Sequence, residues 1–288
     1  MSGAARSPRH RRATAAALLA LALVAPACGS DDGDSSATGD SSATGDASTT
    51  TTGAALPAGA EDLPGRYAHY DVVAYEGDDM KTLIISYGFT DYDLVDGEII
   101  SDDSFCFSEH RSDQPISVEF SDAATQAIRP VPVAVTVTEE DGVLHVSRPA
   151  TPTGIGVRLE DPANDPLPTD PDDPRIADDD GDGNPGVTAT ITVTPELSGE
   201  IYLARREIFA YEAQRQDDGS LTGTVDDDSE QLVIGASDPA FETGGQWTQY
   251  PDPAKSPILL IPVDRSWDCE RLRAERDALF PPTPEVDW

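Results

Sequence analysis

Short runs of β-branched and aromatic residues recur along most of this 288-residue chain, and they limit its fold more than any other feature. In one run Val133, Val135 and Val137 alternate with other residues, as expected for a strand with one buried face. Asp-Gly, glycine and proline separate the runs at intervals of about 8–20 residues, which is typical of antiparallel sheets. The pattern therefore predicts an all-β fold, either an antiparallel sandwich or a barrel. The expected strands cover residues 66–75, 81–87, 115–120, 131–138, 143–147, 154–159, 187–194, 200–205, 221–225, 231–234 and 257–263.

Two Asp-Gly pairs, Asp141-Gly142 and Asp218-Gly219, lie between expected strands. Aspartate and glycine tolerate the positive φ that tight hairpin turns require. Both pairs are therefore expected to form hairpin turns.

One short helix is expected near the C-terminus, from Ser266 to Leu279. Cys269 and Leu272 share one helical face with Leu279, and the serine is a suitable N-cap. Pro281-Pro282 follows and ends the helix, because proline cannot continue it.

The first 27 residues have the three parts of an export signal. Residues 13–25 form an uncharged run of Ala, Leu and Val, and the small residues Ala25-Pro26-Ala27 end it. This run is too short to cross a bilayer, which takes about 20 residues, and it suits the core of a signal peptide. Residues 1–27 are therefore expected to be a signal peptide. The positive charges before the run are Arg6, Arg9, Arg11 and Arg12.

Cys28 follows the signal directly. Here the chain resembles bacterial lipoprotein precursors, whose short lipobox ends in the cysteine that becomes diacylated. The resemblance implies that Cys28 carries a lipid, that the mature protein is anchored to a membrane, and that it lies in the cell envelope outside the cytoplasm. Ala25-Pro26-Ala27 also fits the ordinary Ala-x-Ala cleavage rule, so secretion with a free thiol at Cys28 is the alternative.

The three cysteines of the chain are Cys28, Cys106 and Cys269. If the first is lipidated, two remain, and outside the cytoplasm two thiols tend to form a disulfide. A Cys106–Cys269 bridge would close a loop of about 160 residues and stabilise the fold by about 4 kcal/mol. Two separately buried thiols are the alternative.

Acidic residues dominate the charge, with 54 Asp and Glu against 19 Lys and Arg and a net charge of −35. Removing residues 1–27 takes away four arginines and no acids, so the mature chain carries −39. Such a surface repels nucleic acid and attracts cations, and no nucleic-acid partner is expected.

Residues 28–62 are expected to form a disordered tether. They contain the hexapeptide Ser-Ser-Ala-Thr-Gly-Asp twice in succession, at residues 35–40 and 41–46, and almost no large apolar side chains. Such a segment cannot offset the entropy of ordering its backbone. Residues 63–288 then form a single β domain, long enough for one well-buried core.

An acid-proline loop lies between Asp161 and Gly186. Proline fixes φ and removes a backbone donor, so the segment is expected to be extended rather than a strand. A loop of this length is usually functional or disordered. It could also separate two β subdomains, but the expected cysteine pairing favours one unit.

The loop ends in the sequence Asp178-Asp179-Asp180-Gly181-Asp182-Gly183-Asn184. Asp178, Asp180 and Asp182 alternate, as in the first half of an EF-hand, and calcium requires six to eight oxygen ligands. The three carboxylates and the Asn184 carbonyl are therefore candidate calcium ligands. A solvated acidic loop is the alternative.

This segment resembles the Asp-x-Asp-Gly-Asp-Gly-x-x-Asp loops of extracellular FG-GAP and thrombospondin-type calcium sites. In FG-GAP repeats the loop runs into a β-strand, which residues 187–191 would form here. The resemblance implies one structural calcium ion. Gly186 replaces the ninth-position aspartate, so a further ligand would come from elsewhere. The candidates are Asp173, Glu200 and Asp226, Asp227 and Asp228.

No catalytic constellation is evident, and His69, His110 and His145 are scattered. We expect an exported, lipid-anchored surface or envelope protein with a structural calcium loop and a non-enzymatic binding or structural role. Gly65-Arg66-Tyr67 resembles the start of lipocalins, which have tryptophan at the third place, so a lipocalin-like binder of a small ligand is one alternative. A secreted glycan or ester hydrolase is another. The sequence identifies no protein or glycan partner.

Overall fold

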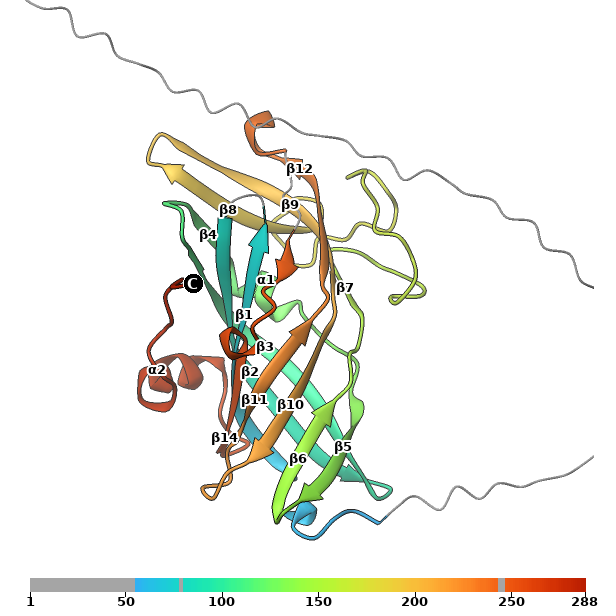
Figure 1. Ribbon diagram of the computed structural model, residues 1–288. Coiled ribbons are helices and arrows are strands. Elements are labelled where there is room, and N and C mark those ends of the chain that lie inside the picture. Colours follow the sequence, from blue (N-terminus) through green and yellow to red (C-terminus); the bar gives the residue numbers. More distant parts are fainter. Residues whose placement is uncertain (1–54, 78–79, 243–246) are drawn as a thin grey trace, which may run out of the picture. The chain divides into compact units, whose positions relative to one another are not determined.

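The computed structural model describes residues 55–77, 80–242 and 247–288 and contains two β-sheets (Figure 1). In the larger sheet, eight antiparallel strands close into a barrel, since β1 pairs with both β2 and β14. The expected all-β fold is confirmed, and the barrel is the correct one of the two expected forms. The barrel strands are β1 (Gly65–Gly77), β2 (Met80–Val95), β3 (Glu98–Ser112), β5 (Val133–Glu140), β6 (Val143–Arg148), β10 (Phe209–Arg215), β11 (Leu221–Asp227) and β14 (Pro257–Val263).

The barrel strands follow one another around the barrel in chain order. Tight turns connect several neighbours, and Asp141-Gly142 between β5 and β6 has φ values of 53° and 85°, as a two-residue hairpin requires. Gly219 between β10 and β11 has φ 84°. Both expected hairpin turns are therefore confirmed.

Three chain segments inserted between barrel strands form the second sheet. Its strand order is β12-β9-β8-β4, and β7 pairs with β9. The first segment, between β3 and β5, contains β4 (Ser117–Phe120) and α1 (Asp122–Gln126). The second, between β6 and β10, contains β7 (Thr153–Ile155), β8 (Val187–Thr194) and β9 (Leu197–Glu207). The third, between β11 and β14, contains β12 (Glu230–Ala236) and β13 (Thr248–Gln249), of which β13 pairs with β1 of the barrel.

One long hairpin joins the two sheets (Figure 1). Only Ile208 separates β9 from β10, and two residues separate β11 from β12. Phe209 of β10 pairs with Asp227 of β11 in the barrel, and just beyond them Arg206 of β9 pairs with Glu230 of β12 in the second sheet. The arm β9–β10 therefore brings polar residues of the second sheet to one mouth of the barrel.

Side chains fill the barrel interior, as is usual for eight strands. Along β1, Tyr67, Val73 and Tyr75 belong to the interior cluster, whereas Tyr70 and Val72 belong to an outer cluster. This alternation follows from the two-residue period of a strand. Ala60, which the sequence places in the tether, is fully buried against the interior cluster.

The helix α2 (Cys269–Leu279) covers the outer face of the barrel. Its N-cap is Asp268, whose carboxylate accepts a hydrogen bond from the Arg271 N–H at 2.9 Å. The expected start at Ser266 is wrong, because Asp268, directly before Cys269, accepts the hydrogen bond from the first turn of the helix. Leu272 is fully buried, and Phe280 packs beside it.

A disulfide joins Cys106 on β3 to Cys269, the first residue of α2, with a Cα–Cα distance of 5.3 Å. The expected pairing is confirmed, and it fastens the C-terminal helix to the barrel wall.

The acid-proline loop contains no strand, as expected, but turns break its extended course. Val157 and Leu167 are buried against Ala204 and Ile234 of the second sheet. Leu167, from within the loop, and Val157, just before it, thus hold the loop against the second sheet, because burial of apolar side chains is favourable. The ion pairs Arg158–Asp179 and Arg175–Asp173, at 2.5 and 2.9 Å, tie it further.

Residues 1–54 lie outside the described residues, and with them the expected signal peptide, Cys28 and most of the expected tether. Among the helices of the described chain, none combines the length and the apolar character needed to cross a membrane.

Candidate functional site

The acidic loop brings its three alternating carboxylates together. One carboxylate oxygen from each of Asp178, Asp180 and Asp182 lies within 4.8 Å of the others. The backbone N–H groups of Gly181, Asp182 and Gly183 donate to the Asp178 carboxylate at 2.7, 3.1 and 2.9 Å. Gly181 and Gly183 have φ values of 73° and 90°, which glycine adopts without strain. The turn therefore curls around Asp178 and points its neighbours to the same side.

Asp180 occupies the most buried position of this cluster. Its Oδ2 accepts a hydrogen bond from the Thr188 N–H at 2.9 Å. Its Oδ1 is buried without a partner among the described residues, and so is the Thr188 hydroxyl. Burial raises the pKa of Asp180, and the negative charges of Asp182 and Asp178 raise it further. A buried carboxylate oxygen without a donor is costly, and a cation at this point would remove the cost.

Asn184, whose carbonyl stays a candidate ligand, also contacts one of the three carboxylates. Its backbone N–H and its side-chain amide both donate to Asp182, at 2.8 and 3.1 Å, so Asn184 fixes the orientation of that carboxylate. The other acids proposed from the sequence do not join the cluster in the described part of the chain. Asp173 is bound to Arg175. Asp226 and Asp227 are the last residues of the barrel strand β11, and Asp228 follows it. The loop therefore offers three carboxylates, which fit a metal ion.

A second group of polar residues lies inside the barrel. His69 Nε2 is 2.8 Å from Asp71 Oδ2, and His69 Nδ1 is 2.9 Å from Thr90 Oγ1. The Thr90 hydroxyl donates to Asp103 Oδ1 at 2.6 Å. Arg148 Nε donates to Asp103 Oδ2 at 2.7 Å. The result is a continuous chain of buried contacts that crosses from β1 through β2 and β3 to β6.

Arg148 closes this chain and is one of the largest fully buried side chains. Its Nη1 donates to the Phe209 carbonyl at 2.9 Å, and its Nη2 donates to the Thr151 hydroxyl at 2.8 Å. The guanidinium carbon lies 4.2 Å from the centre of the Phe209 ring. Every nitrogen of the guanidinium therefore has a partner, as a buried charge requires.

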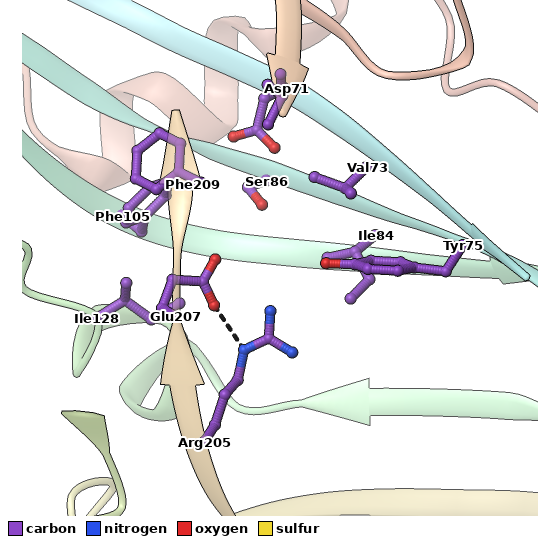
Figure 2. A pocket seen from close by; sticks show the side chains of 11 residues that line it. Asp71, Val73, Tyr75, Ile84, Ser86, Phe105, Ile128, Arg205, Glu207 and Phe209 are labelled. Carbon is purple, nitrogen blue, oxygen red and sulfur yellow. Dashed lines mark hydrogen bonds and ion pairs between the residues drawn. The ribbon is translucent and has the colours of Figure 1, made fainter. Parts of the chain in front are cut away.

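A small chamber lies where the barrel meets the second sheet (Figure 2). Its polar wall contains Asp71 and Ser86 on the barrel side and the Arg205–Glu207 ion pair, 2.5 Å long, on β9. The remaining lining side chains are Val73, Tyr75, Ile84, Phe105, Ile128, Phe209 and Val225. The chamber has a volume of about 20 Å³, which is close to the space that one water molecule needs.

Asp227 lies behind the chamber and is buried. The Tyr75 hydroxyl donates to its Oδ1 at 2.7 Å, and the Ser229 hydroxyl donates to its Oδ2 at 2.9 Å. Burial raises the pKa of Asp227 to about 6, the charge of Glu207 adds to the rise, and Arg205 opposes it. The mouth of the barrel thus contains more carboxylates than fixed cations.

The chain of buried contacts around His69 was missed by the sequence analysis, which treated the histidines as scattered. His110 and His145 do lie apart from it, on β3 and β6. The residues of the chain come from strands that are distant in sequence, and closure of the barrel brings them together. One signal was present: His69 and Asp71 occupy alternate positions of a strand whose other side is apolar, which places both on the interior face.

The chain was compared with protein-family models, with curated proteins and with solved structures, and none of them matches.

Proposed function

We propose that this protein is an exported, lipid-anchored β-barrel domain with a non-enzymatic binding or structural role, and that its acidic loop binds one calcium ion. The observation that carries the metal site is the buried, unpartnered Oδ1 of Asp180 within a cluster of three convergent carboxylates. A bound cation would supply the partner that this oxygen lacks.

Calcium is the cation that suits these ligands. The cluster offers only oxygen atoms, whereas zinc and copper favour imidazole or thiolate. Calcium accepts irregular shells of six to eight oxygens, and water or backbone carbonyls can complete the shell around Asp178, Asp180 and Asp182. Magnesium requires a near-ideal octahedron and loses its water reluctantly.

Side chains fill the barrel interior, and this argues against a lipocalin-like binder of a small ligand. A lipocalin-like binder has an open apolar interior, whereas Tyr92, Phe105 and Tyr211 occupy the interior here. The hydroxyls of Tyr92 and Tyr211 are 2.5 Å apart across it. The chamber that gathers Asp71 and Glu207 has room for about one water molecule and not for a sugar ring. We therefore do not place the lipocalin-like alternative first, and this chamber gives the hydrolase alternative no support.

Calcium is expected to raise the melting temperature of the protein, and Asp180→Asn is expected to abolish that rise. At a hundredfold excess of calcium over its dissociation constant, binding adds about 2.7 kcal/mol, or roughly 5–10 °C for a domain of this size. Magnesium is expected to produce a much smaller shift. Calorimetric melting curves with each ion, matched for ionic strength, measure both effects.

Asp172→Asn is the matched control for this experiment, because Asp172 is an exposed aspartate of the same loop outside the cluster. This variant should respond to calcium as the wild type does. Equal shifts for calcium and magnesium, or an unchanged calcium response in Asp180→Asn, would contradict the proposed site.

The lipid anchor gives a separate prediction for Cys28→Ser. Without the thiol no diacyl chain can be attached, so the variant is expected to move from the membrane fraction to the soluble fraction. Cell fractionation with incorporation of labelled fatty acid measures the change. Ser30→Ala, in the same segment, is the control and should remain lipidated. Retention of Cys28→Ser in membranes would show that a lipid on this residue is not the anchor.

A further inference from the structure

The buried hydrogen bonds that link His69, Thr90 and Asp103 can run in only one direction, and the charge of Asp103 sets that direction. Arg148 Nε donates to Asp103 Oδ2 at 2.7 Å, and both side chains are fully buried. The carboxylate of such a pair is ionised and can only accept hydrogen bonds. Thr90 Oγ1, at 2.6 Å from Asp103 Oδ1, must therefore donate its single hydrogen to Asp103.

The direction at Thr90 determines the proton on His69 Nδ1. Since the Thr90 hydrogen is directed to Asp103, the hydroxyl oxygen can only accept from the imidazole. Nδ1, 2.9 Å away, must therefore carry a hydrogen and donate it to Thr90.

The other ring nitrogen then requires a second proton. Nε2 lies 2.8 Å from Asp71 Oδ2, and a bare nitrogen facing a carboxylate would put two acceptors in contact. We infer that His69 and Asp71 bind one proton between them, so that the barrel interior contains a proton-binding site in the form of an imidazolium–carboxylate pair. This site is independent of the proposed calcium loop and of the lipid anchor.

The charges around His69 agree with this inference. Two carboxylates lie within reach of the ring, Asp71 at 2.8 Å and Asp103 at 4.0 Å. The guanidinium that also contacts Asp103 belongs to Arg148. A positive ring between two carboxylates and one guanidinium leaves this part of the interior neutral, which is the arrangement that costs least in a buried site. The neighbouring strands contribute Thr90 on β2, Asp103 and Phe105 on β3, Arg148 on β6, Phe209 on β10 and Leu260, the register partner of His69, on β14.

The chamber adjoins this proton-binding pair. Asp71 lines the chamber (Figure 2), and its Oδ1 has no hydrogen-bond partner among the described residues. Asp71 is only 4% exposed. The chamber that it lines has room for about one water molecule, which could contact this oxygen. A water there would donate a hydrogen bond to Oδ1.

The test is nitrogen-15 NMR of the histidine side chains in the folded protein at neutral pH. For wild-type His69 we expect both ring nitrogens to carry a proton. In Asp71→Asn the amide can donate to Nε2, so the network is satisfied without the extra proton. In that variant we expect only Nδ1 to be protonated. Asp227→Asn is the control, because Asp227 is another buried acid that does not contact His69, and the His69 signals should not change.

The wild-type spectrum alone decides the inference even if a variant fails to fold. Protonation of both ring nitrogens supports it. A neutral ring beside an Asp71 that carries the proton, seen in the carbon-13 shift of its carboxyl group, also supports it, because the pair still binds one proton. An unprotonated Nε2 facing an ionised Asp71 would overturn it.

Discussion

Arg148→Met is expected to lower the free energy of unfolding by about 3–5 kcal/mol, because it leaves the carboxylate of Asp103 buried without its counter-charge. The side chains of Arg148 and Asp103 are both 0% exposed. The substitution also removes the donors to the Phe209 carbonyl and to Thr151. Arg148→Lys is expected to be destabilised as well, since a lysine cannot reproduce the forked contacts of the guanidinium. Denaturant unfolding followed by circular dichroism measures these losses.

Arg158→Met is the matched control, because it removes the guanidinium from an ion pair in which Arg158 is 65% exposed. Exposed pairs contribute only about 0–1 kcal/mol. The double variant Arg148→Met with Asp103→Asn removes both charges and should recover part of the loss. A wild-type stability for Arg148→Met, or equal losses for Arg148→Met and Arg158→Met, would show that the buried pair does not stabilise the barrel.

Removing the disulfide is expected to produce the second large loss. The bridge links residues 163 positions apart, and a loop of this length corresponds to about 4–5 kcal/mol in the chain-entropy account. For a domain of this size the melting temperature should fall by roughly 10–15 °C. The double variant Cys106→Ser with Cys269→Ser, examined by calorimetry, tests this.

Reductant provides the control for that experiment. It should lower the melting temperature of the wild type to that of the double variant, and it should leave the variant unchanged. The helix α2 also packs through Leu272 and through an ion pair between Arg276 and Glu109, so the folded state should persist. If the double variant melts with the wild type, the bridge contributes nothing to stability.

Local patterns in the sequence were sufficient for the fold class. The alternation of Val133, Val135 and Val137 and the Asp141-Gly142 turn are properties of neighbouring residues, and β5 and β6 form where they predict. The cysteine pairing followed from the number of thiols and the expected compartment. The cap of α2 was misplaced by two residues, from Ser266 to Asp268, because both residue types can cap a helix and only packing selects between them.

For the acidic loop, the sequence determined which residues meet but not how the loop is held. The spacing of Asp178, Asp180 and Asp182 predicted that their carboxylates would meet, as they do. The burial of Asp180 Oδ1 and the role of Asn184 depend on Thr188 and on contacts that the loop makes as it packs. The apolar residues that fold the acid-proline segment onto the second sheet, such as Leu167, have no periodic pattern.

The sequence by itself determined the fold class, the turns, the paired cysteines, the acidic cluster and most of the strands, because each depends on short-range periodicity, on backbone preferences or on a simple count. It did not predict β3 or β10, two strands that the barrel requires. The tertiary structure alone decided that the sheet closes through β1 and β14, and closure cannot be inferred from any local pattern. It also decided the chemistry of the interior. Asp71, Thr90, Asp103 and Arg148 meet around His69 only because four strands turn the same faces inward. In water each of these groups would be solvated separately. In the low dielectric of the closed barrel they interact strongly, so the charge and protonation of each group depend on the others.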